Sequence, residues 1–531
     1  MKKYLNLILI TVSAVLISAS FAPWYFWPAA LICLSPIFYL LHFDRLSLKS
    51  AFWYGTLLGI LIDILSYHWV IHTIEVYGHL PLFAAIPLFF LYAFATNLRY
   101  PFFLMAVVYL KHRLPQTGKL SFLSSEYFLY PVLFLFFENV CWQLFPYYGG
   151  NLLSGNSILI QVADIIGTRG LTAFWLIINL AVFQMILYRK QSGELKSIRP
   201  ALNFTAVLLL VLTVYGIVRK NTYDAQGKPT LNVAVPQGHT PLAFQSLGSM
   251  RAQLTAIVTG MVEQTLQIIA EQKNKGVETD LIVWPESAVP FLTLESSSML
   301  QNHIAYLQNA AKIPFIFNDI LRRSEGSYSN VWYLDESGQR VENYQKAFLL
   351  PFGEFMPLGE RFPKLKSLFP EVSDFTPGTR SVLFHHPKAK LLPLVCYEVI
   401  IPEYVRELHQ NTGFAANVMI NITNDTWFGE SIESSQHMEL GRMRAIELRM
   451  PIVRATNSGI SALIHADGNI EGQTPLFTKA NAFYRVPMFA PVTTFFARWG
   501  NLWLYLIIAT GLAVMLYGLI LNRRSTPAAR L

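Results

Sequence analysis

Long apolar runs dominate the first 220 residues, and one more lies near the C-terminal end. Each approaches the roughly 20 residues that an α-helix needs to cross a bilayer. The fourth run contains Arg99 near Pro101, so we expect a kink or break there. Arg99 is either a site residue or the partner of a group on another helix. The pattern predicts a polytopic α-helical membrane domain with about eight transmembrane helices. The runs cover residues 4–19, 27–41, 52–70, 82–110, 127–141, 171–187, 202–218 and 502–521.

Between the seventh and eighth runs, short β-rich stretches alternate with helical ones. This alternation favours an α/β layered fold. The predicted domains are therefore a transmembrane domain (1–220), an α/β domain (221–498) and a last helix with a tail (499–531). Strands are expected at 231–236, 280–284, 313–317, 390–396, 416–422, 452–455 and 462–465, a hairpin at 331–334 and 340–344, and helices at 252–273 and 434–449.

Composition and charge agree with a membrane protein. Hydrophobic residues make up 53% of the chain and charged residues 14%, whereas about a quarter of residues are charged in soluble proteins. The net charge is +8, but the basic residues form short clusters between apolar runs, which argues against a nucleic-acid partner. The clusters occupy alternate loops, which places both termini in the cytoplasm and the 221–498 domain outside it.

The first apolar run has a second interpretation. Lys2-Lys3, a short apolar core and Ser20-Phe21-Ala22 also fit a cleaved signal peptide. Cleavage would leave six crossings before the 221–498 domain, so this domain lies outside the cytoplasm in either case.

Three predicted strands of the α/β domain end in polar residues, at the position where open α/β folds place their chemistry. Glu286 follows a strand in Trp284-Pro285-Glu286, Lys346 precedes an apolar loop at 348–358, and Cys396 ends the strand in LLPLVCYEVII. Cys396 is also the single cysteine between 221 and 498, so no disulfide framework is possible there. Taken singly, each residue has an ordinary alternative: a helix-terminal carboxylate, a surface amine and an inert thiol.

Together the three strand ends resemble the Glu-Lys-Cys triad of the nitrilase, or carbon-nitrogen hydrolase, superfamily. With apolar helices before and after, the whole chain is similar to the apolipoprotein N-acyltransferase family, a membrane-embedded branch of it. The resemblance implies an αββα sandwich on the periplasmic side of a bacterial inner membrane. The supporting motifs are Pro351-Phe352-Gly353-Glu354, Cys396-Tyr397-Glu398, Asn424-Asp425-Thr426-Trp427-Phe428-Gly429 and Arg454-Ala455-Thr456-Asn457-Ser458-Gly459.

The resemblance also implies a ping-pong acyl transfer. Cys396 takes an acyl chain from a glycerophospholipid as a thioester and passes it to the α-amine of a diacylglyceryl apolipoprotein. Glu286 is the implied base, and Lys346 with a backbone N–H such as that of Tyr397 stabilises the oxyanion. Glu354 and Glu398 are expected to orient Lys346 or tune Glu286. The expected acyl or head-group pocket residues are Tyr397, Trp427 and Asn424.

Two other functions remain open on the sequence. A membrane-tethered amidase or nitrilase acting on small amides would share the triad but would not need the apolar 348–358 loop. A transporter or sensor with an inactive nitrilase-like domain would tolerate loss of Cys396. No cofactor is implied and no metal-ligand spacing is found; His437, on a polar helix, is predicted to be an ordinary surface histidine.

Overall fold

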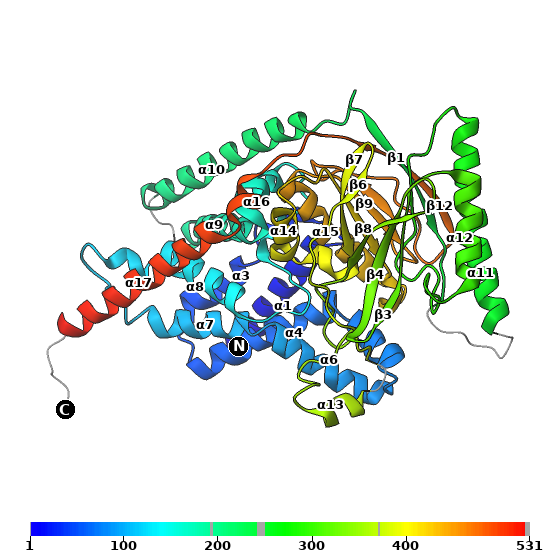
Figure 1. Cartoon of the computed structure of the whole chain (residues 1–531). Coiled ribbons are helices and arrows are strands. Elements are labelled where there is room, and N and C mark those ends of the chain that lie inside the picture. The colour runs from blue at the N-terminus through cyan, green and yellow to red at the C-terminus, as the bar shows by residue number, and fades with distance from the viewer. Residues whose placement is uncertain (1, 192–194, 242–249, 370–371, 526–531) are drawn as a thin grey trace. The chain divides into compact units, whose positions relative to one another are not determined.

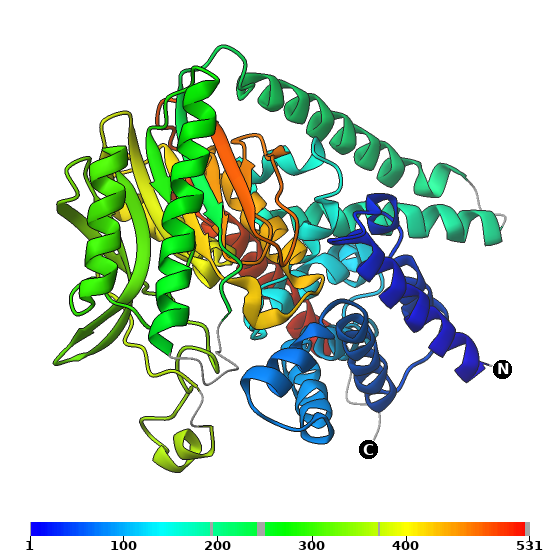
Figure 2. The same cartoon turned by 90° about the vertical axis from the view of Figure 1, so that its right-hand side faces the viewer.

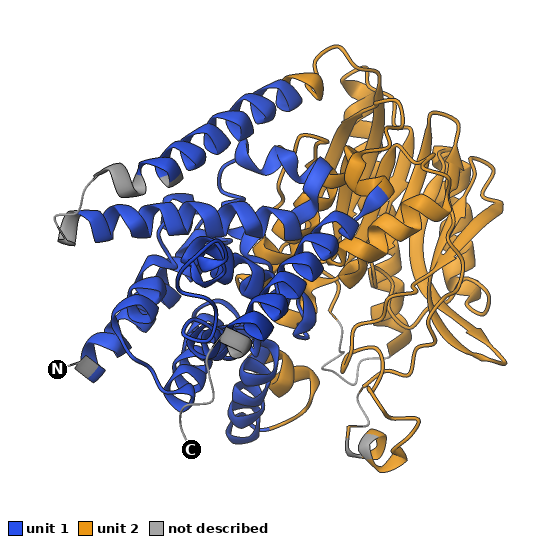
Figure 3. Cartoon of the chain, turned by 90° about the vertical axis from the view of Figure 1, so that its left-hand side faces the viewer, with its two compact units in different colours: residues 1–71, 81–220, 499–531 blue, residues 72–80, 221–498 orange. Residues whose placement is uncertain are grey.

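The computed structural model describes residues 2–191, 195–241, 250–369 and 372–525. The chain forms two compact units, coloured separately in Figure 3. The first comprises residues 1–71, 81–220 and 499–531, and the second comprises residues 72–80 and 221–498. The second unit therefore contains a short segment, His72–Leu80, that comes from between two apolar runs.

The first unit is helical, as its apolar runs predict. Helix α9 is interrupted, because its backbone is non-helical at Gly167 (φ 68°). The helices, most of which are labelled in Figure 1, are α1 Lys2–Ser20, α2 Trp27–Ala30, α3 Ser35–Phe43, α4 Leu48–Ser66, α5 Trp69–His72, α6 Leu82–Thr96, α7 Arg99–Leu110, α8 Glu126–Val140, α9 Ala163–Gln191, α10 Leu195–Thr222 and α17 Leu502–Ser525. The short 3-10 helices are η2 Ser121–Ser124, η3 Gly149–Leu153 and η4 Leu159–Val162.

The predicted count of eight spans is not confirmed. Among the described residues, five helices are long and apolar enough to cross a membrane, or six if the bent pair α6 and α7 is one span. The run at 27–41 is split, because α2 ends at Ala30 and α3 begins at Ser35. The run at 127–141 forms α8, which has only 15 residues, fewer than the roughly 20 that a crossing needs.

The break at Arg99 is confirmed. Helix α6 ends at Thr96, α7 begins at Arg99, and the two are bent by 44°. The buried Arg99 guanidinium donates a hydrogen bond to Gln143 Oε1 (3.1 Å) and lies 3.8 Å from Glu138 Oε1 of α8. Arg99 is therefore paired with a group on another helix, as the cost of an isolated intramembrane charge predicts.

The second unit contains two six-stranded sheets. The first has the order β12-β1-β2-β3-β4-β5 and the second β11-β10-β9-β8-β7-β6. In each, the central three strands (β1-β2-β3 and β7-β8-β9) are parallel and the others antiparallel. The strands are β1 Thr230–Gln237, β2 Leu281–Val283, β3 Phe315–Arg323, β4 Gly326–Leu334, β5 Arg340–Gln345, β6 Phe384–His386, β7 Ala389–Val395, β8 Val418–Thr423, β9 Ile452–Thr456, β10 Ala462–Ile464, β11 Ile470–Glu471 and β12 Ala480–Pro487.

Helices cover the outer face of each sheet. Figure 2 shows α11 Met250–Asn274 and α12 Ser298–Ala311 side by side over the first sheet, and their apolar faces meet the sheet in a buried core that includes Val258, Leu300, Ile282 and Phe315. Helices α14 Pro402–Asn411 and α15 Glu433–Leu448 lie on the side of the second sheet (Figure 1). The predicted αββα sandwich is thus confirmed. The remaining short elements are α13 Pro363–Leu368, α16 Phe495–Trp499, η1 Thr73–Tyr77, η5 Cys396–Ile400 and η6 Asp425–Phe428.

Candidate active site

Cys396 lies at the carboxyl end of β7, where the strand turns into η5. The residues before it, Leu391 to Val395, are apolar and buried, as expected of a strand inside a parallel sheet. The strand stops because Cys396 adopts a left-handed backbone conformation (φ 49°), which costs a non-glycine residue about 1–2 kcal/mol. Glu398 stabilises the turn, because its Oε2 accepts a hydrogen bond from the Val395 N–H (2.8 Å). The thiol is thus held at a sharp, buried strand end.

Glu286 and Lys346 come to the same place from the first sheet. Glu286 follows β2 and Lys346 follows β5 directly. The Lys346 Nζ lies 3.8 Å from Glu286 Oε1, and both side chains are buried. Both are close enough to the Cys396 thiol for their charges to shift its pKa. The structure therefore brings the three predicted strand-end residues into one cluster between the two sheets.

Burial and neighbouring charge set the acidities of the cluster. Burial, and then the charge of Glu286, raise the pKa of the Cys396 thiol above its ordinary value, whereas Lys346 and a hydrogen bond with Thr423 act in the opposite direction. Burial also raises the pKa of Glu286 to about 7, although Lys346 opposes this shift. The cluster thus pairs a protonated thiol with a carboxylate whose pKa suits a general base near neutral pH.

Glu354 lies against Lys346. Its Oε1 accepts a hydrogen bond from Lys346 Nζ (2.6 Å), and its Oε2 accepts one from the Leu350 N–H (2.7 Å). Burial alone would lower the pKa of Lys346, but the carboxylates of Glu354 and Glu286 outweigh it and raise this pKa. Lys346 therefore stays protonated, and the hydrogen bond to Glu354 fixes the position of its ammonium group.

Glu398 has a different environment from Glu354. Its Oε1 accepts hydrogen bonds from the Tyr344 hydroxyl (2.7 Å) and from the N–H groups of Ala347 (2.8 Å) and Phe348 (3.1 Å). Its Oε2 accepts the hydrogen bond from the N–H of Val395, the residue before Cys396. Glu398 thus ties the chain just after Lys346 to the strand that carries Cys396.

The three predicted pocket residues differ in exposure. Tyr397 and Asn424 are buried, whereas the Trp427 side chain is 36% exposed. Asn424 caps η6, because its Oδ1 accepts hydrogen bonds from the Thr426 N–H (3.2 Å) and hydroxyl (2.6 Å). Of the three, Trp427 is the most accessible to a ligand.

The segment His72–Leu80 also contacts the loop that carries Trp427. The Tyr77 hydroxyl donates a hydrogen bond to the Thr426 carbonyl (2.8 Å), and its ring centroid lies 4.6 Å from that of Trp427. The Thr73 hydroxyl donates to the Trp427 carbonyl (3.2 Å). No local sequence signal indicates contacts across about 350 residues, so these contacts could not be predicted.

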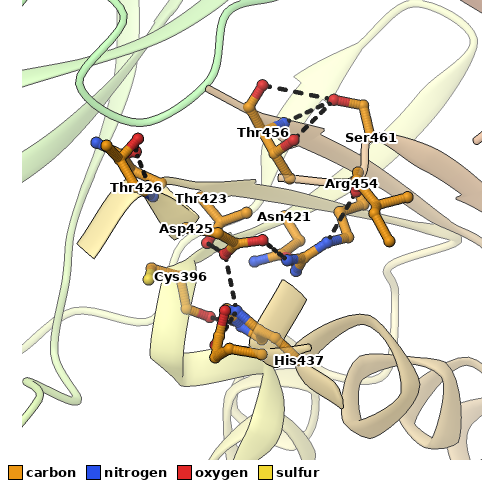
Figure 4. Close-up of polar contacts among 12 residues, drawn as sticks. Cys396, Asn421, Thr423, Asp425, Thr426, His437, Arg454, Thr456 and Ser461 are labelled. Carbon is orange, nitrogen blue, oxygen red and sulfur yellow. Dashed lines mark hydrogen bonds and ion pairs between the residues drawn. The ribbon is translucent and has the colours of Figure 1, made fainter. Parts of the chain in front are cut away.

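The prediction of a surface position for His437 is wrong. His437 is only 5% exposed, and Figure 4 shows its imidazole below Cys396, next to the backbone oxygen of that residue. Its Nδ1 lies 3.1 Å from Asp425 Oδ1, and its Nε2 lies 3.2 Å from the Cys396 carbonyl oxygen. Arg454 in turn donates to Asp425 Oδ2 (2.8 Å) and Asn421 Oδ1 (3.0 Å). The helix that carries His437, α15, is rich in polar residues, and these side chains pair with other buried polar groups.

Among the described residues, Asp425, Glu433 and His437 bring possible metal-ligand atoms within 4.8 Å of one another. The Asp425 oxygens already have Arg454 and His437 as partners, and the adjoining guanidinium repels a cation. This cluster is therefore better described as an ion-pair network than as a metal centre.

We expect Arg454→Met to destabilise the second unit by about 3–5 kcal/mol, because it leaves the buried Asp425 carboxylate without its cation. The expected fall in melting temperature, on the order of 10 °C, can be measured in detergent by tryptophan fluorescence. Arg323→Met is the matched control. Arg323 pairs with Glu295 at 2.7 Å, but the two side chains are 39% and 36% exposed, so its loss should cost less than about 1 kcal/mol. Equal stability of the two variants would contradict the prediction.

Comparison with known proteins gives two family matches. Residues 13–181 match the model of the apolipoprotein N-acyltransferase N-terminal domain, and residues 246–486 match that of carbon-nitrogen hydrolase. Apolipoprotein N-acyltransferase 2 of Leptospira interrogans is 30% identical, with 87% of each chain covered. The Bdellovibrio bacteriovorus apolipoprotein N-acyltransferase is 28% identical over 97% of this chain and 94% of its own. A crystal structure of an amidase from Nesterenkonia sp. has a TM-score of 0.36 at 14% identity, covering 53% of this chain and 96% of that chain.

Proposed function

The chain belongs to the apolipoprotein N-acyltransferase family, and from this membership we propose that it transfers an acyl chain from a glycerophospholipid to an apolipoprotein. The acceptor is the α-amine of the N-terminal S-diacylglyceryl-cysteine, and Cys396 carries the acyl chain as a thioester. The expected location is a bacterial inner membrane, with the catalytic unit on the periplasmic side and both termini in the cytoplasm.

The observation that supports this mechanism best is the buried cluster of Cys396, Glu286 and Lys346. A thiol attacks an ester only as a thiolate, so it needs a base. Glu286 takes the thiol proton as the sulfur bonds to the ester carbonyl carbon. Lys346 and the Tyr397 N–H stabilise the negative charge that develops on the carbonyl oxygen. Collapse of this intermediate breaks the ester bond, and the lysophospholipid oxygen leaves with the proton from Glu286.

The second half-reaction uses the same groups. The acceptor amine attacks the thioester carbonyl, Glu286 takes a proton from the amine, and Cys396 leaves and regains a proton. Water would compete with the amine unless the site excludes it. The 348–358 loop supports this requirement with its apolar side chains, of which Phe352 is 52% and Leu358 is 65% exposed. We assign these side chains and Trp427 to acyl-chain contact.

The test of the proposed function is the mass of the intermediate. Purified protein in detergent, mixed with a phosphatidylethanolamine of defined acyl chains and digested, is expected to give a Cys396 peptide that is heavier by one acyl group. Addition of a diacylglyceryl-cysteinyl peptide should remove this adduct and yield the N-acylated peptide. Absence of the adduct, together with hydrolysis of small amides, would instead support the amidase alternative.

A further inference from the structure

His437 contacts the backbone carbonyl group of the nucleophile, Cys396. Its Nε2 lies 3.2 Å from the Cys396 carbonyl oxygen, and a carbonyl oxygen can only accept a hydrogen bond. The two atoms are therefore hydrogen-bonded in the tautomer that carries the proton on Nε2. We propose that His437 is a positioning residue that fixes the direction of the Tyr397 N–H, the backbone donor to the oxyanion; this inference rests on the proposed function.

The link between the two groups is the peptide plane. The Cys396 carbonyl and the Tyr397 N–H belong to one planar, trans peptide group, so they point in opposite directions. A bond that fixes the carbonyl oxygen therefore fixes the N–H on the other side. Donation to the carbonyl also polarises the same peptide group and strengthens its N–H as a donor. His437 thus acts on the oxyanion without touching the substrate.

This restraint matters because the backbone at Cys396 is strained. Its left-handed φ of 49° is a conformation that persists only where the surroundings stabilise it. Relaxation at Cys396 would rotate the following peptide group and turn the Tyr397 N–H away. A transition state needs its donors within tenths of an ångström of the oxyanion, so a small rotation has a large effect on rate.

The imidazole is itself held from three elements, as Figure 4 shows in part. Asp425 of η6 lies on its Nδ1 side, and Glu433 Oε1, one turn earlier on α15, lies 3.6 Å from the same nitrogen. Arg454 of β9 binds Asp425 on the other oxygen. All four side chains are buried, so the ring has little freedom to rotate.

The geometry excludes His437 as the base for the thiol. Its Nε2 faces the Cys396 carbonyl, and its Nδ1 faces the carboxylates of Asp425 and Glu433. Neither ring nitrogen has a lone pair directed to sulfur. This leaves proton transfer to Glu286 and a positioning role to His437.

Two variants, His437→Gln and His437→Asn, distinguish the role of Nε2 from that of Nδ1. The amide nitrogen of glutamine can take the place of Nε2, whereas that of asparagine reaches only the place of Nδ1. We expect His437→Asn to lower the single-turnover rate of Cys396 acylation by about 10–100-fold, somewhat less than the loss of a whole oxyanion donor, with the half-saturating lipid concentration unchanged. His437→Gln should restore the rate to within about 3-fold of wild type, since it retains the donor.

Alkylation by iodoacetamide provides the control, because displacement of iodide creates no oxyanion. The alkylation rate of Cys396 and the melting temperature should stay close to wild type in both variants. Acylation is measured with phosphatidylethanolamine and with p-nitrophenyl octanoate, which develops the same oxyanion. Wild-type protein that reacts only with the second ester would overturn the proposed phospholipid donor but still test His437.

Three results would overturn the inference. In the first, His437→Asn is acylated as fast as wild type. In the second, alkylation falls in proportion to acylation, which indicates a general disturbance of the site. In the third, His437→Gln is no faster than His437→Asn, so the Nε2 donor has no specific role. Failure of wild type to react with either ester would overturn both this inference and the proposed function.

Discussion

Cys396→Ser is expected to abolish thioester formation and to lower acyl transfer by on the order of 10⁴-fold or more, the scale seen when a catalytic nucleophile is lost. The change replaces one buried atom and leaves Glu286 and Lys346 in place, so the fold should persist. A serine hydroxyl is far less acidic than a thiol, and a carboxylate whose pKa is about 7 is too weak a base to ionise it. The variant is assayed by mass spectrometry of the acyl-enzyme and by N-acylation of a diacylglyceryl-cysteinyl peptide.

Cys141→Ser is the matched control, because Cys141 is a half-buried thiol in the first unit. Its N-acylation rate should stay within about 3-fold of wild type, as expected for a substitution away from the reacting atoms. Wild-type acyl transfer by Cys396→Ser would contradict the mechanism. An unchanged phenotype in cells would further favour a sensor or transporter with an inactive nitrilase-like domain.

The strand ends that carry Glu286 and Cys396 were predictable because buried parallel strands leave a strong local signal, whereas Lys346 follows β5, a partly exposed antiparallel strand that was predicted as half of a hairpin. An unbroken apolar run that stops at one polar residue indicates both the strand and its carboxyl end. Strand β12 and helix α12 were not predicted. The β12 sequence ANAFYRVP and the α12 sequence SMLQNHIAYLQNAA mix polar and apolar residues, and long-range packing decides their structure.

The membrane domain shows the limits of counting apolar runs. The sequence at 127–141 is apolar enough for a span, but α8 starts at Glu126 and ends at Val140. Glu126 pairs with His42 (2.8 Å) and Lys111 (3.4 Å), so its buried charge is satisfied by residues distant in sequence. A hydropathy profile gives the length of an apolar run, but it does not show which of the polar groups beside the run have hydrogen-bond or ion-pair partners.

His437 was misjudged for the same reason. Its helix, α15, contains Glu433, Glu439, Arg442 and Glu447, a composition typical of a solvated surface, yet all of these are buried. Ion pairs within the helix, such as Arg442 with Glu439 (3.2 Å), and pairs to other elements replace water. A single sequence shows the charges but not their partners across 30 or more residues, so this part of the site required the structure.

Glu286→Gln is expected to lower the acylation rate of Cys396 by roughly 10²–10⁴-fold, the usual contribution of a general base. The fold should tolerate the change, because Lys346 keeps its 2.6 Å contact with Glu354. The acylation rate of the wild-type protein should also depend on pH. Burial raises the pKa of Glu286 to about 7, so the carboxyl is protonated and inactive as a base below that pH. The wild-type rate should therefore rise with pH, reach a plateau above about 7, and stay there while Lys346 remains protonated, since its pKa is raised.

In Glu286→Gln no carboxylate titrates at this position, so the inflection near pH 7 should disappear. The residual rate should then climb toward high pH as the thiol ionises, because burial raises the pKa of Cys396. Glu295→Gln is the control, since Glu295 is a partly exposed carboxylate that pairs with Arg323, and it should keep both the rate and the inflection. An inflection near pH 7 that survives in Glu286→Gln would assign the titrating base to another group. The shape of the profile thus identifies the base even if the loss of rate alone has several causes.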